Sequence, residues 1–270
     1  MQSPELPLVE HALGQSQIES ATAAHQASGD REQPAPQYRG VVDLPRFGEM
    51  LGGGFPAGHV VLVTGLPGTG KTCFGLQFLV AGAARGERGV FLSLEEDVGP
   101  LLESARQFHW PVDAAVKDGS LKILRVDPKE TRQSLHRIQG ELGRELQALK
   151  AQRIVVDSVS LLNMLSDDEP GRRATLFALA AACRDAGATT VLTAEADPVH
   201  PGVSRDGLSE YVADGVVLLE YRTGADGHRV GLALRILKMR RTSHVRTVQP
   251  YAIGPSGLSV DAKAIDFGSP

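Results

Sequence analysis

Eight consecutive residues in the first third of the chain have the composition of a loop that binds phosphate groups. They read Gly65-Leu66-Pro67-Gly68-Thr69-Gly70-Lys71-Thr72 and fill every fixed position of the pattern G-x-x-x-x-G-K-[ST]. In such a loop the backbone N–H groups turn toward a β-phosphate, the lysine contacts the β- and γ-phosphates, and the final hydroxyl ligates Mg²⁺. The residues expected at the nucleotide are Gly65, Pro67, Gly68, Thr69, Gly70, Lys71 and Thr72, with Thr72 also a metal ligand.

The segments on either side of this loop supply the elements that must hold it. The apolar run Val60-Val61-Leu62-Val63 precedes it, as a buried strand would, and a helical segment from Lys71 to Ala84 follows, before Gly86. A Gly-rich turn that matched the pattern by accident would have no reason to lie between a strand and a helix. We therefore expect the chain to bind a nucleoside triphosphate.

A second apolar run supplies a candidate metal ligand. Ile154-Val155-Val156-Asp157 has the form of a buried strand that terminates in a carboxylate, and phosphoryl transfer needs such a carboxylate to hold Mg²⁺. The plain alternative is that Asp157 caps a turn or helix. With a phosphate loop in the same chain, we interpret Asp157 as the second Mg²⁺ ligand.

Two adjacent glutamates follow another predicted strand, Val90 to Leu94. Ligands in open α/β sheets bind beyond the carboxyl ends of the strands, so Glu95 and Glu96 should face the nucleotide. One of them can accept the proton of an attacking water, which makes the pair the candidate catalytic residues. The alternative is a pair of solvated acids at the start of the next helix.

Strands and helices alternate through most of the chain. Strands are expected at 59–65, 89–94, 121–126, 153–157, 189–194 and 215–221, and helices at 71–84, 98–109, 172–185 and across the leucine-rich segment from 127 to 149. Short strands at 232–239, 246–248, 251–253 and 258–260 complete the pattern. This order indicates an α/β fold: a P-loop core with a mostly parallel twisted sheet flanked by helices, and a C-terminal antiparallel extension. The RecA-like character of this core is implied by the family resemblance described below.

The ends of the chain differ in composition from its centre. Residues 1–38 are rich in Gln, Ser, Ala, Pro and Glu, and their scattered apolar residues cannot bury a face, so we expect a disordered N-terminal tail. A docking role for this tail is unsupported. The ATPase domain is expected at 39–262, followed by a flexible C-terminus at 263–270.

Charge and hydropathy narrow the classes of partner. The 28 Lys and Arg against 32 Asp and Glu give a net charge of -4, so no global positive field attracts nucleic acid or an anionic membrane. The sequence has neither an apolar run of membrane-spanning length nor a signal-peptide pattern. We expect no membrane association and a cytoplasmic location.

Six motifs, in order, resemble the KaiC-type branch of the RecA superfamily of ATPases. The resemblance covers residues 40–260, the whole predicted ordered domain. Besides the phosphate loop it includes Gly52-Gly53-Gly54-Phe55-Pro56-Ala57-Gly58, which resembles the family's GGG-x-P-x-G segment, and Ser93-Leu94-Glu95-Glu96, which resembles its paired glutamates. The remaining matches are Asp157-Ser158, Thr193-Ala194-Glu195, Ala213-Asp214-Gly215-Val216, and Lys238-Met239-Arg240 with His244.

This resemblance implies a role for the last motif. In the family, the residues that match Lys238, Arg240 and His244 reach the γ-phosphate of ATP bound to the adjacent subunit. The resemblance therefore implies ATP and Mg²⁺ as ligands, and a homo-oligomer, expected to be a hexameric ring, with nucleotide at its interfaces. If only the residue types are considered, the alternative is that these three residues belong to a solvent-exposed edge strand, since edge strands often carry basic side chains.

The sequence also departs from the family. Phe47-Gly48 replaces a leucine-aspartate pair ahead of the GGG segment, and Glu210-Tyr211-Val212-Ala213 offers no Ser or Thr where the autokinase domain of the clock protein carries acceptors. The expected activity is therefore ATP hydrolysis in a regulatory or signalling role, without autokinase activity. A regulatory protein partner stays open.

Two other functions remain. One is a RecA- or RadA-like DNA-dependent ATPase in recombination or repair, which the acidic balance disfavours, as does the segment 196–207, whose only Lys or Arg is Arg205. The other is a nucleotide-sensing interaction module with very slow turnover. The carboxylates Glu95, Glu96 and Asp157 argue against an inactive enzyme.

Overall fold

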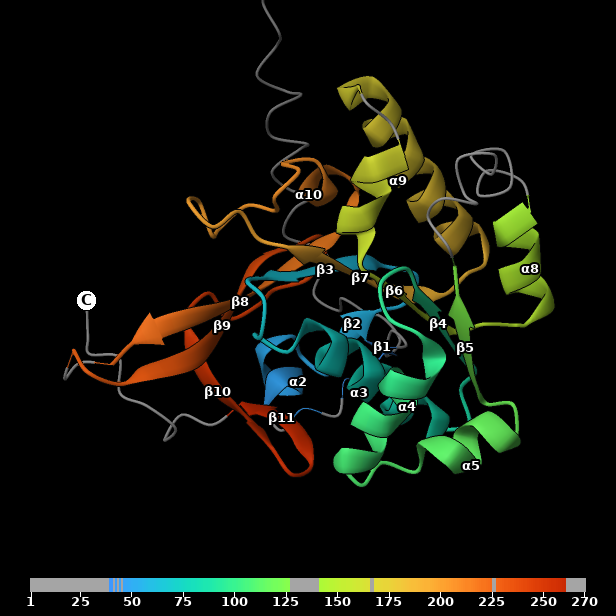
Figure 1. Cartoon of the computed structure of the whole chain (residues 1–270), viewed down its shortest axis with the longest axis horizontal. Helices are drawn as coiled ribbons and strands as arrows, with labels where there is room; N and C mark the ends of the chain where they lie inside the picture. Colours follow the sequence, from blue (N-terminus) through green and yellow to red (C-terminus); the bar gives the residue numbers. More distant parts are fainter. Residues whose placement is uncertain are drawn as a thin grey trace, which may run out of the picture. The chain divides into compact units, whose positions relative to one another are not determined.

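A nine-stranded sheet forms the centre of the protein (Figure 1). The computed structural model describes residues 39–40, 42, 44, 46–126, 141–165, 168–224 and 227–260. The strands of this sheet, in spatial order, are β11 (Gly257–Val260), β10 (Gln249–Gly254), β9 (Val230–Met239), β8 (Gly215–Thr223), β3 (Val60–Gly65), β7 (Thr189–Glu195), β6 (Arg153–Asp157), β4 (Gly89–Ser93) and β5 (Leu121–Arg125). A two-stranded sheet pairs β1 (Arg39–Gly40) with β2 (Phe55–Pro56).

The sheet changes direction at β8. From β8 to β5 every neighbouring pair is parallel, whereas β9, β10 and β11 continue from β8 in antiparallel order. The predicted fold class, a mostly parallel sheet with a C-terminal antiparallel extension, is confirmed. Because parallel strands run in one direction, their carboxyl ends meet along one edge of the sheet.

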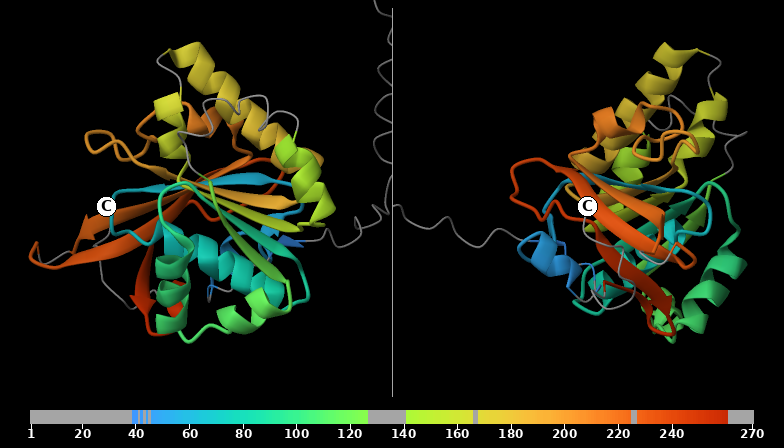
Figure 2. Two further views of the ribbon diagram at one scale, coloured as in Figure 1. Left: turned by 45° about the vertical axis from the view of Figure 1, so that its right-hand side comes forward. Right: turned by 90° about the vertical axis from the view of Figure 1, so that its left-hand side faces the viewer.

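Helices cover both faces of the sheet (Figure 2). One face carries α3 (Lys71–Ala83), α4 (Val98–Gln107) and α5 (Val112–Lys117); the other carries η2 (Val159–Leu165), α8 (Gly143–Ala148), α9 (Glu169–Asp185) and α10 (Ser209–Val212). A hydrophobic core lies on each face, the first core beneath α3, α4 and α5 and the second core beneath α8, α9 and α10. Because successive residues of a strand point to opposite faces, Val61 and Val63 pack in the first core and Val60 and Leu62 pack in the second. No helix in the described ranges combines the length and apolar character needed to cross a bilayer.

Several predicted boundaries differ from the structure. The strand expected at 246–248 is wrong: this segment is irregular, Arg246 and Thr247 are exposed, and the Val245 N–H donates to the Met50 carbonyl outside the sheet. The helix expected at 98–109 ends at Gln107, and α5 follows it. Neither α5 nor the one-turn helices α2 (Phe47–Met50) and α10 is long enough to show a periodic pattern.

Other predictions fall wholly or partly outside the described residues. Both the disordered tail expected at 1–38 and the flexible terminus expected at 263–270 do so. Within the leucine-rich segment from 127 to 149, the structure describes α8, where Leu146 is buried against the second core.

A buried ion pair ties the strand that ends in Asp157 to helix α3. Arg153, at the start of β6, is fully buried and pairs with Glu87, in the turn after α3. Its guanidinium also donates to the Phe78 carbonyl (2.7 Å) and lies 4.7 Å from the centre of the Phe78 ring. Gly82 leaves the room for this side chain, because a Cβ there would approach Arg153 Cδ to 2.5 Å.

Removing one partner of this pair should destabilise the fold strongly. Glu87→Ala leaves the Arg153 charge buried without its carboxylate, so we expect the free energy of unfolding to fall by about 3–5 kcal/mol in urea denaturation. Asp113→Ala, which breaks the exposed Arg106–Asp113 pair, is the matched control and should leave the midpoint unchanged. A loss below about 1 kcal/mol for Glu87→Ala would contradict the prediction.

Candidate nucleotide-binding site

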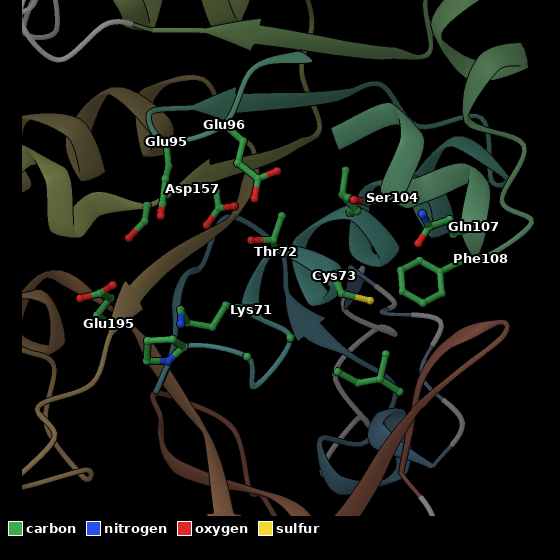
Figure 3. Close-up of a pocket in the computed structure, with 16 residues that line it drawn as sticks. Lys71, Thr72, Cys73, Glu95, Glu96, Ser104, Gln107, Phe108, Asp157 and Glu195 are labelled. Carbon is green, nitrogen blue, oxygen red and sulfur yellow. The ribbon is translucent and has the colours of Figure 1, made fainter. Parts of the chain in front are cut away.

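Four parallel strands bring the predicted site residues to one cavity. The loop after β3, the residues after β4, and the last residues of β6 and β7 meet at the carboxyl edge of the sheet. They line a cavity of about 400 Å³ together with the start of α3 and one side of α4 (Figure 3). Of the predicted residues, Pro67, Gly68, Gly70, Lys71, Thr72, Glu95, Glu96 and Asp157 line it.

The phosphate loop requires glycine for steric reasons. A Cβ on Gly65 would lie 2.5 Å from the Leu219 carbonyl, and Gly68 and Gly70 have φ of 81° and 88°, in the left-handed region. The Thr69 hydroxyl, fully buried, donates to the Leu66 carbonyl (2.8 Å) and closes the turn. Helix α3 begins directly after this loop, at Lys71, which lines the cavity. The N–H groups at the N-terminus of α3 therefore face the cavity.

Lys71 lies against the loop it belongs to. Its Nζ donates to the carbonyls of Gly65 (3.0 Å) and Leu66 (3.1 Å). Burial lowers the pKa of Lys71, while Glu195, Asp157 and Glu95 oppose that shift by favouring the charged form. The lysine is thus a cation held among carboxylates, at the place where β- and γ-phosphates would lie.

The residues present fit a magnesium ion. Asp157 is buried, its carboxylate accepts a hydrogen bond from the Thr193 hydroxyl, and the nearby Thr72 hydroxyl also favours its charged form. Burial raises the pKa of Asp157, and the two hydroxyls oppose the shift. No group of three or more His, Cys, Asp or Glu arranged to hold a metal occurs in the described part of the chain. Thr72 and Asp157 would therefore hold Mg²⁺ as it is usually held, with phosphate oxygens and water completing the shell.

The glutamate pair lies beside this position. The Ser93 hydroxyl accepts from the Glu96 N–H (3.1 Å) and fixes the backbone just after β4. Figure 3 shows Glu95, Glu96 and Asp157 on one side of the cavity, near Thr72. Partial burial raises the pKa of Glu95, and the nearby charges of Asp157, Glu195 and Glu96 raise it further, against the opposing effect of Lys71. A carboxylate whose affinity for a proton is raised is suited to general-base work.

One acidic residue of the cavity received no role in the sequence analysis. Glu195 ends β7 next to the phosphate loop, in register with Gly65, and lines the cavity near Lys71. Its carboxylate pairs with Arg205 (3.0 Å), in the loop that follows β7. The sequence did contain a signal for Glu195, because this residue lies at the end of a predicted strand, as Asp157 does.

The other end of the cavity is less charged. It is lined by Cys73 and Leu76 of α3, by Ser104, Gln107 and Phe108 at the end of α4, and by Ile253 of β10. Apolar walls with a few polar groups suit the base and sugar of a nucleotide. These residues were missed because they come from three distant segments with no common motif.

The basic residues predicted to act on a neighbour's nucleotide lie away from this cavity. Lys238, Arg240 and His244 are absent from its lining. Met239, between the first two, pairs with Gly215 at the start of β8, and Gly215 is in register with Val61 near the start of β3. The four steps of β3 from Val61 to Gly65 therefore separate this amino edge of the sheet from the start of the phosphate loop by about 13 Å.

Hydrogen bonds hold this basic cluster in place. Lys238 Nζ donates to the carbonyls of Ala213 (2.7 Å) and Glu210 (3.2 Å), and burial, with Arg240 nearby, lowers its pKa. Arg240 pairs with Asp214 (3.5 Å), and its side chain is half exposed. His244 Nδ1 lies 3.4 Å from the Thr242 carbonyl. These contacts fix the cluster, and within it the Arg240 side chain is exposed to solvent.

Comparison with known proteins shows the family. The sequence profile described as "ATPase: KaiC" matches residues 42–264. The chain belongs to the KaiC family of ATPases. The match spans one KaiC-like domain, and family membership makes its phosphate loop part of an ATP-binding site.

Individual relatives agree with this assignment. The chain is 35% identical over 221 residues to the circadian clock oscillator protein KaiC of Synechococcus elongatus, covering 79% of this chain and 42% of that one. It is 32% identical over 217 residues to the circadian clock protein KaiC3 of Synechocystis, covering 78% and 43%. It thus spans less than half the length of these curated relatives.

A solved structure is similar over its whole length. The crystal structure of a KaiC-like protein from Pyrococcus horikoshii OT3 superposes with a TM-score of 0.72 at 34% identity, covering 84% of this chain and all of the other. This chain therefore shares its fold with a KaiC-like protein from an archaeon.

The acidic cluster should weaken the nucleotide-free fold. Because the pKa of Glu95 is raised, its proton stabilises the fold at low pH, and that contribution is lost as pH rises through the raised value. We expect Glu95→Gln to raise the thermal midpoint near pH 8, and the gain to vanish as the pH falls below the ordinary glutamate pKa of 4.5. Differential scanning fluorimetry measures both.

The exposed Glu103→Gln, on the outer side of α4, is the control and should leave the midpoint unchanged at either pH. A gain for Glu95→Gln that is independent of pH would show that ionisation of Glu95 does not strain the site.

Proposed function

We propose that this protein binds Mg²⁺ and ATP and hydrolyses ATP at the interfaces of a ring-shaped homo-oligomer, a hexamer, in a regulatory role. The observation that carries the proposal is the distribution of charge. A cavity with one lysine and four carboxylates lies at one edge of the sheet, and an ordered, accessible basic cluster lies at the opposite edge.

The cavity supplies the groups that position ATP and water. N–H groups of the loop and Lys71 bind the β- and γ-phosphates, and the base and ribose occupy the end lined by Gln107, Phe108 and Ile253. Thr72 and Asp157 would hold Mg²⁺, which would supply positive charge to neutralise the phosphates. Glu95 accepts a proton from the attacking water, whose oxygen bonds to the γ-phosphorus while the bond to ADP breaks.

A neighbouring subunit completes the site. Around the cavity, Glu95, Glu96, Asp157 and Glu195 face Lys71, and Arg205 is already paired with Glu195. Charge on the γ-phosphoryl oxygens in the transition state calls for a further cation, which Lys238 or Arg240 of the next subunit would supply. Head-to-tail contacts of this kind generate rings when the rotation closes.

The glutamate pair can be tested apart from ATP binding. Glu95→Gln/Glu96→Gln keeps the volume and polarity of both side chains and removes the base, so we expect ATP affinity and assembly to persist while turnover falls by about 10²–10⁴. Calorimetry, light scattering and phosphate release measure the three properties. Lys71→Ala should instead weaken binding itself. Unchanged turnover in the double Gln variant would place the base elsewhere.

Subunit mixing tests action between subunits. Lys238→Ala/Arg240→Ala should lose most turnover while its own cavity stays intact, and Glu95→Gln/Glu96→Gln should lose turnover while its basic cluster stays intact. Random 1:1 mixing of the two variants rebuilds about one quarter of the interfaces from undamaged halves, because each interface takes one edge from each subunit.

We therefore expect phosphate release to recover to about a quarter of the wild-type value on mixing. Absence of recovery in mixed rings, shown to form by mass photometry, would contradict action between subunits. Turnover that requires added single-stranded DNA would favour a DNA-dependent ATPase instead.

A further inference from the structure

Two tyrosine hydroxyls from the C-terminal strands contact the back of the phosphate loop. Tyr251 of β10 donates to the Thr69 carbonyl (2.5 Å), and Tyr221 of β8 donates to the Pro67 carbonyl (3.1 Å). Both strands belong to the part of the sheet beyond the phosphate-loop strand, more than 150 residues later in the chain. No motif named above includes either tyrosine.

Peptide geometry gives these two contacts a specific consequence. A trans peptide is planar, with its carbonyl and N–H pointing in opposite directions. The Pro67 carbonyl shares its peptide with the Gly68 N–H, and the Thr69 carbonyl shares its peptide with the Gly70 N–H. A hydroxyl that holds either carbonyl outward therefore holds the corresponding N–H inward, toward the cavity that Gly68 and Gly70 line.

The same strands press on the loop at the two glycines. A Cβ on Gly68 would lie 2.6 Å from the Tyr221 hydroxyl, and a Cβ on Gly70 would lie 2.7 Å from Ile253 Cδ1. Gln77 of α3 bonds both the N–H (2.8 Å) and the carbonyl (3.1 Å) of Leu258 in β11, which fixes the β10–β11 hairpin against the helix that follows the loop. The side chains of β8 and β10 thus restrict the positions that the loop can adopt.

The two hydroxyls differ in their access to water. Tyr251 and Thr69 are buried, and burial raises the pKa of Tyr251, so its hydroxyl keeps the proton that it donates. Tyr221 is 44% exposed, and Pro67, whose carbonyl it contacts, is also exposed to solvent. Water can replace the Tyr221 hydroxyl in part, but the Thr69 carbonyl has no such substitute within a buried site.

We propose that Tyr221 and Tyr251 are positioning residues for nucleotide binding: their hydroxyls hold the Gly68 and Gly70 N–H groups in the orientation that receives phosphate. Strand β8, at the end of the parallel part of the sheet, and strand β10 of the antiparallel extension thereby set the affinity of a loop that follows β3. This inference rests on the proposed function for the identity of the ligand, but the order of the loop can be measured without any ligand.

The test compares Tyr251→Phe and Tyr221→Phe with the wild-type chain. We expect Tyr251→Phe to raise the Kd for Mg²⁺ and ATP by about 5- to 20-fold and Tyr221→Phe by about two- to threefold, in calorimetry. Because the loop holds phosphate in ground and transition states alike, KM should rise more than kcat falls. Affinity for AMP, which lacks the β- and γ-phosphates, should be unchanged.

Hydrogen exchange of the nucleotide-free protein supplies the second readout. Peptides covering residues 65–72 should exchange faster in Tyr251→Phe than in the wild type. Tyr211→Phe, at an exposed tyrosine whose ring stacks on Arg173, is the matched control and should change neither exchange in that segment nor Kd. If Tyr251→Phe fails to fold, Tyr221→Phe, at an exposed position, carries the test.

The outcomes separate the two hypotheses. Folded Phe variants with wild-type Kd and wild-type exchange at 65–72 would overturn the positioning role and leave the proposed function standing. A wild-type chain that does not bind ATP would overturn the proposed function, while faster exchange in Tyr251→Phe would still support control of the loop by the tyrosines.

Discussion

The structure depends on a constraint that a phosphate-binding loop imposes on its own backbone. N–H groups that converge on an anion force the carbonyls of the same peptides to face the other way, and buried carbonyls require donors. Side-chain donors to the carbonyls of Gly65, Leu66, Pro67 and Thr69 come from Lys71, Thr69, Tyr221 and Tyr251. The loop therefore depends on strands β8 and β10, which supply the two tyrosines, as well as on the strand β3 that leads into it.

Electrostatics around the loop follow from parallel strand order. Strands that run together end together, so Glu95, Asp157 and Glu195 gather around one lysine although 100 residues separate the first from the last. Partial burial, together with like charges held this closely, raises the pKa of Glu95, and the same charges would favour the binding of cations. Without nucleotide these carboxylates repel one another, and bound cations would reduce that repulsion.

The last strands of the sheet reach both of its edges. Tyr221, near the end of β8, and Tyr251 and Ile253 of β10 lie at the phosphate loop, whereas Lys238 and Arg240, at the end of β9, lie at the opposite edge. The reversal of strand direction between β8 and β9 creates this separation, because β9 ends where β8 begins. Neighbouring strands thus contribute both to the cavity and to the surface that would meet another subunit.

Much of this could be predicted from the sequence. The phosphate loop, Asp157 and the glutamate pair are local patterns, in which a short segment specifies both its backbone shape and its position at a strand end, and the alternation of strands and helices predicted the mostly parallel sheet. The strand expected at 246–248 was wrong, because whether an exposed segment pairs depends on a partner strand rather than on its own residues.

The tertiary structure alone decided which distant residues share the cavity. Glu195, Gln107, Phe108 and Ile253 come from separate segments, and the tyrosine contacts join residues 154 and 182 positions apart. The sequence by itself determined the chemistry of the loop, since glycines, a lysine and a threonine at fixed spacing allow few other uses. Strand order decided what surrounds that loop, because side-chain contacts across a sheet depend on which strands lie next to each other and not on their order along the chain.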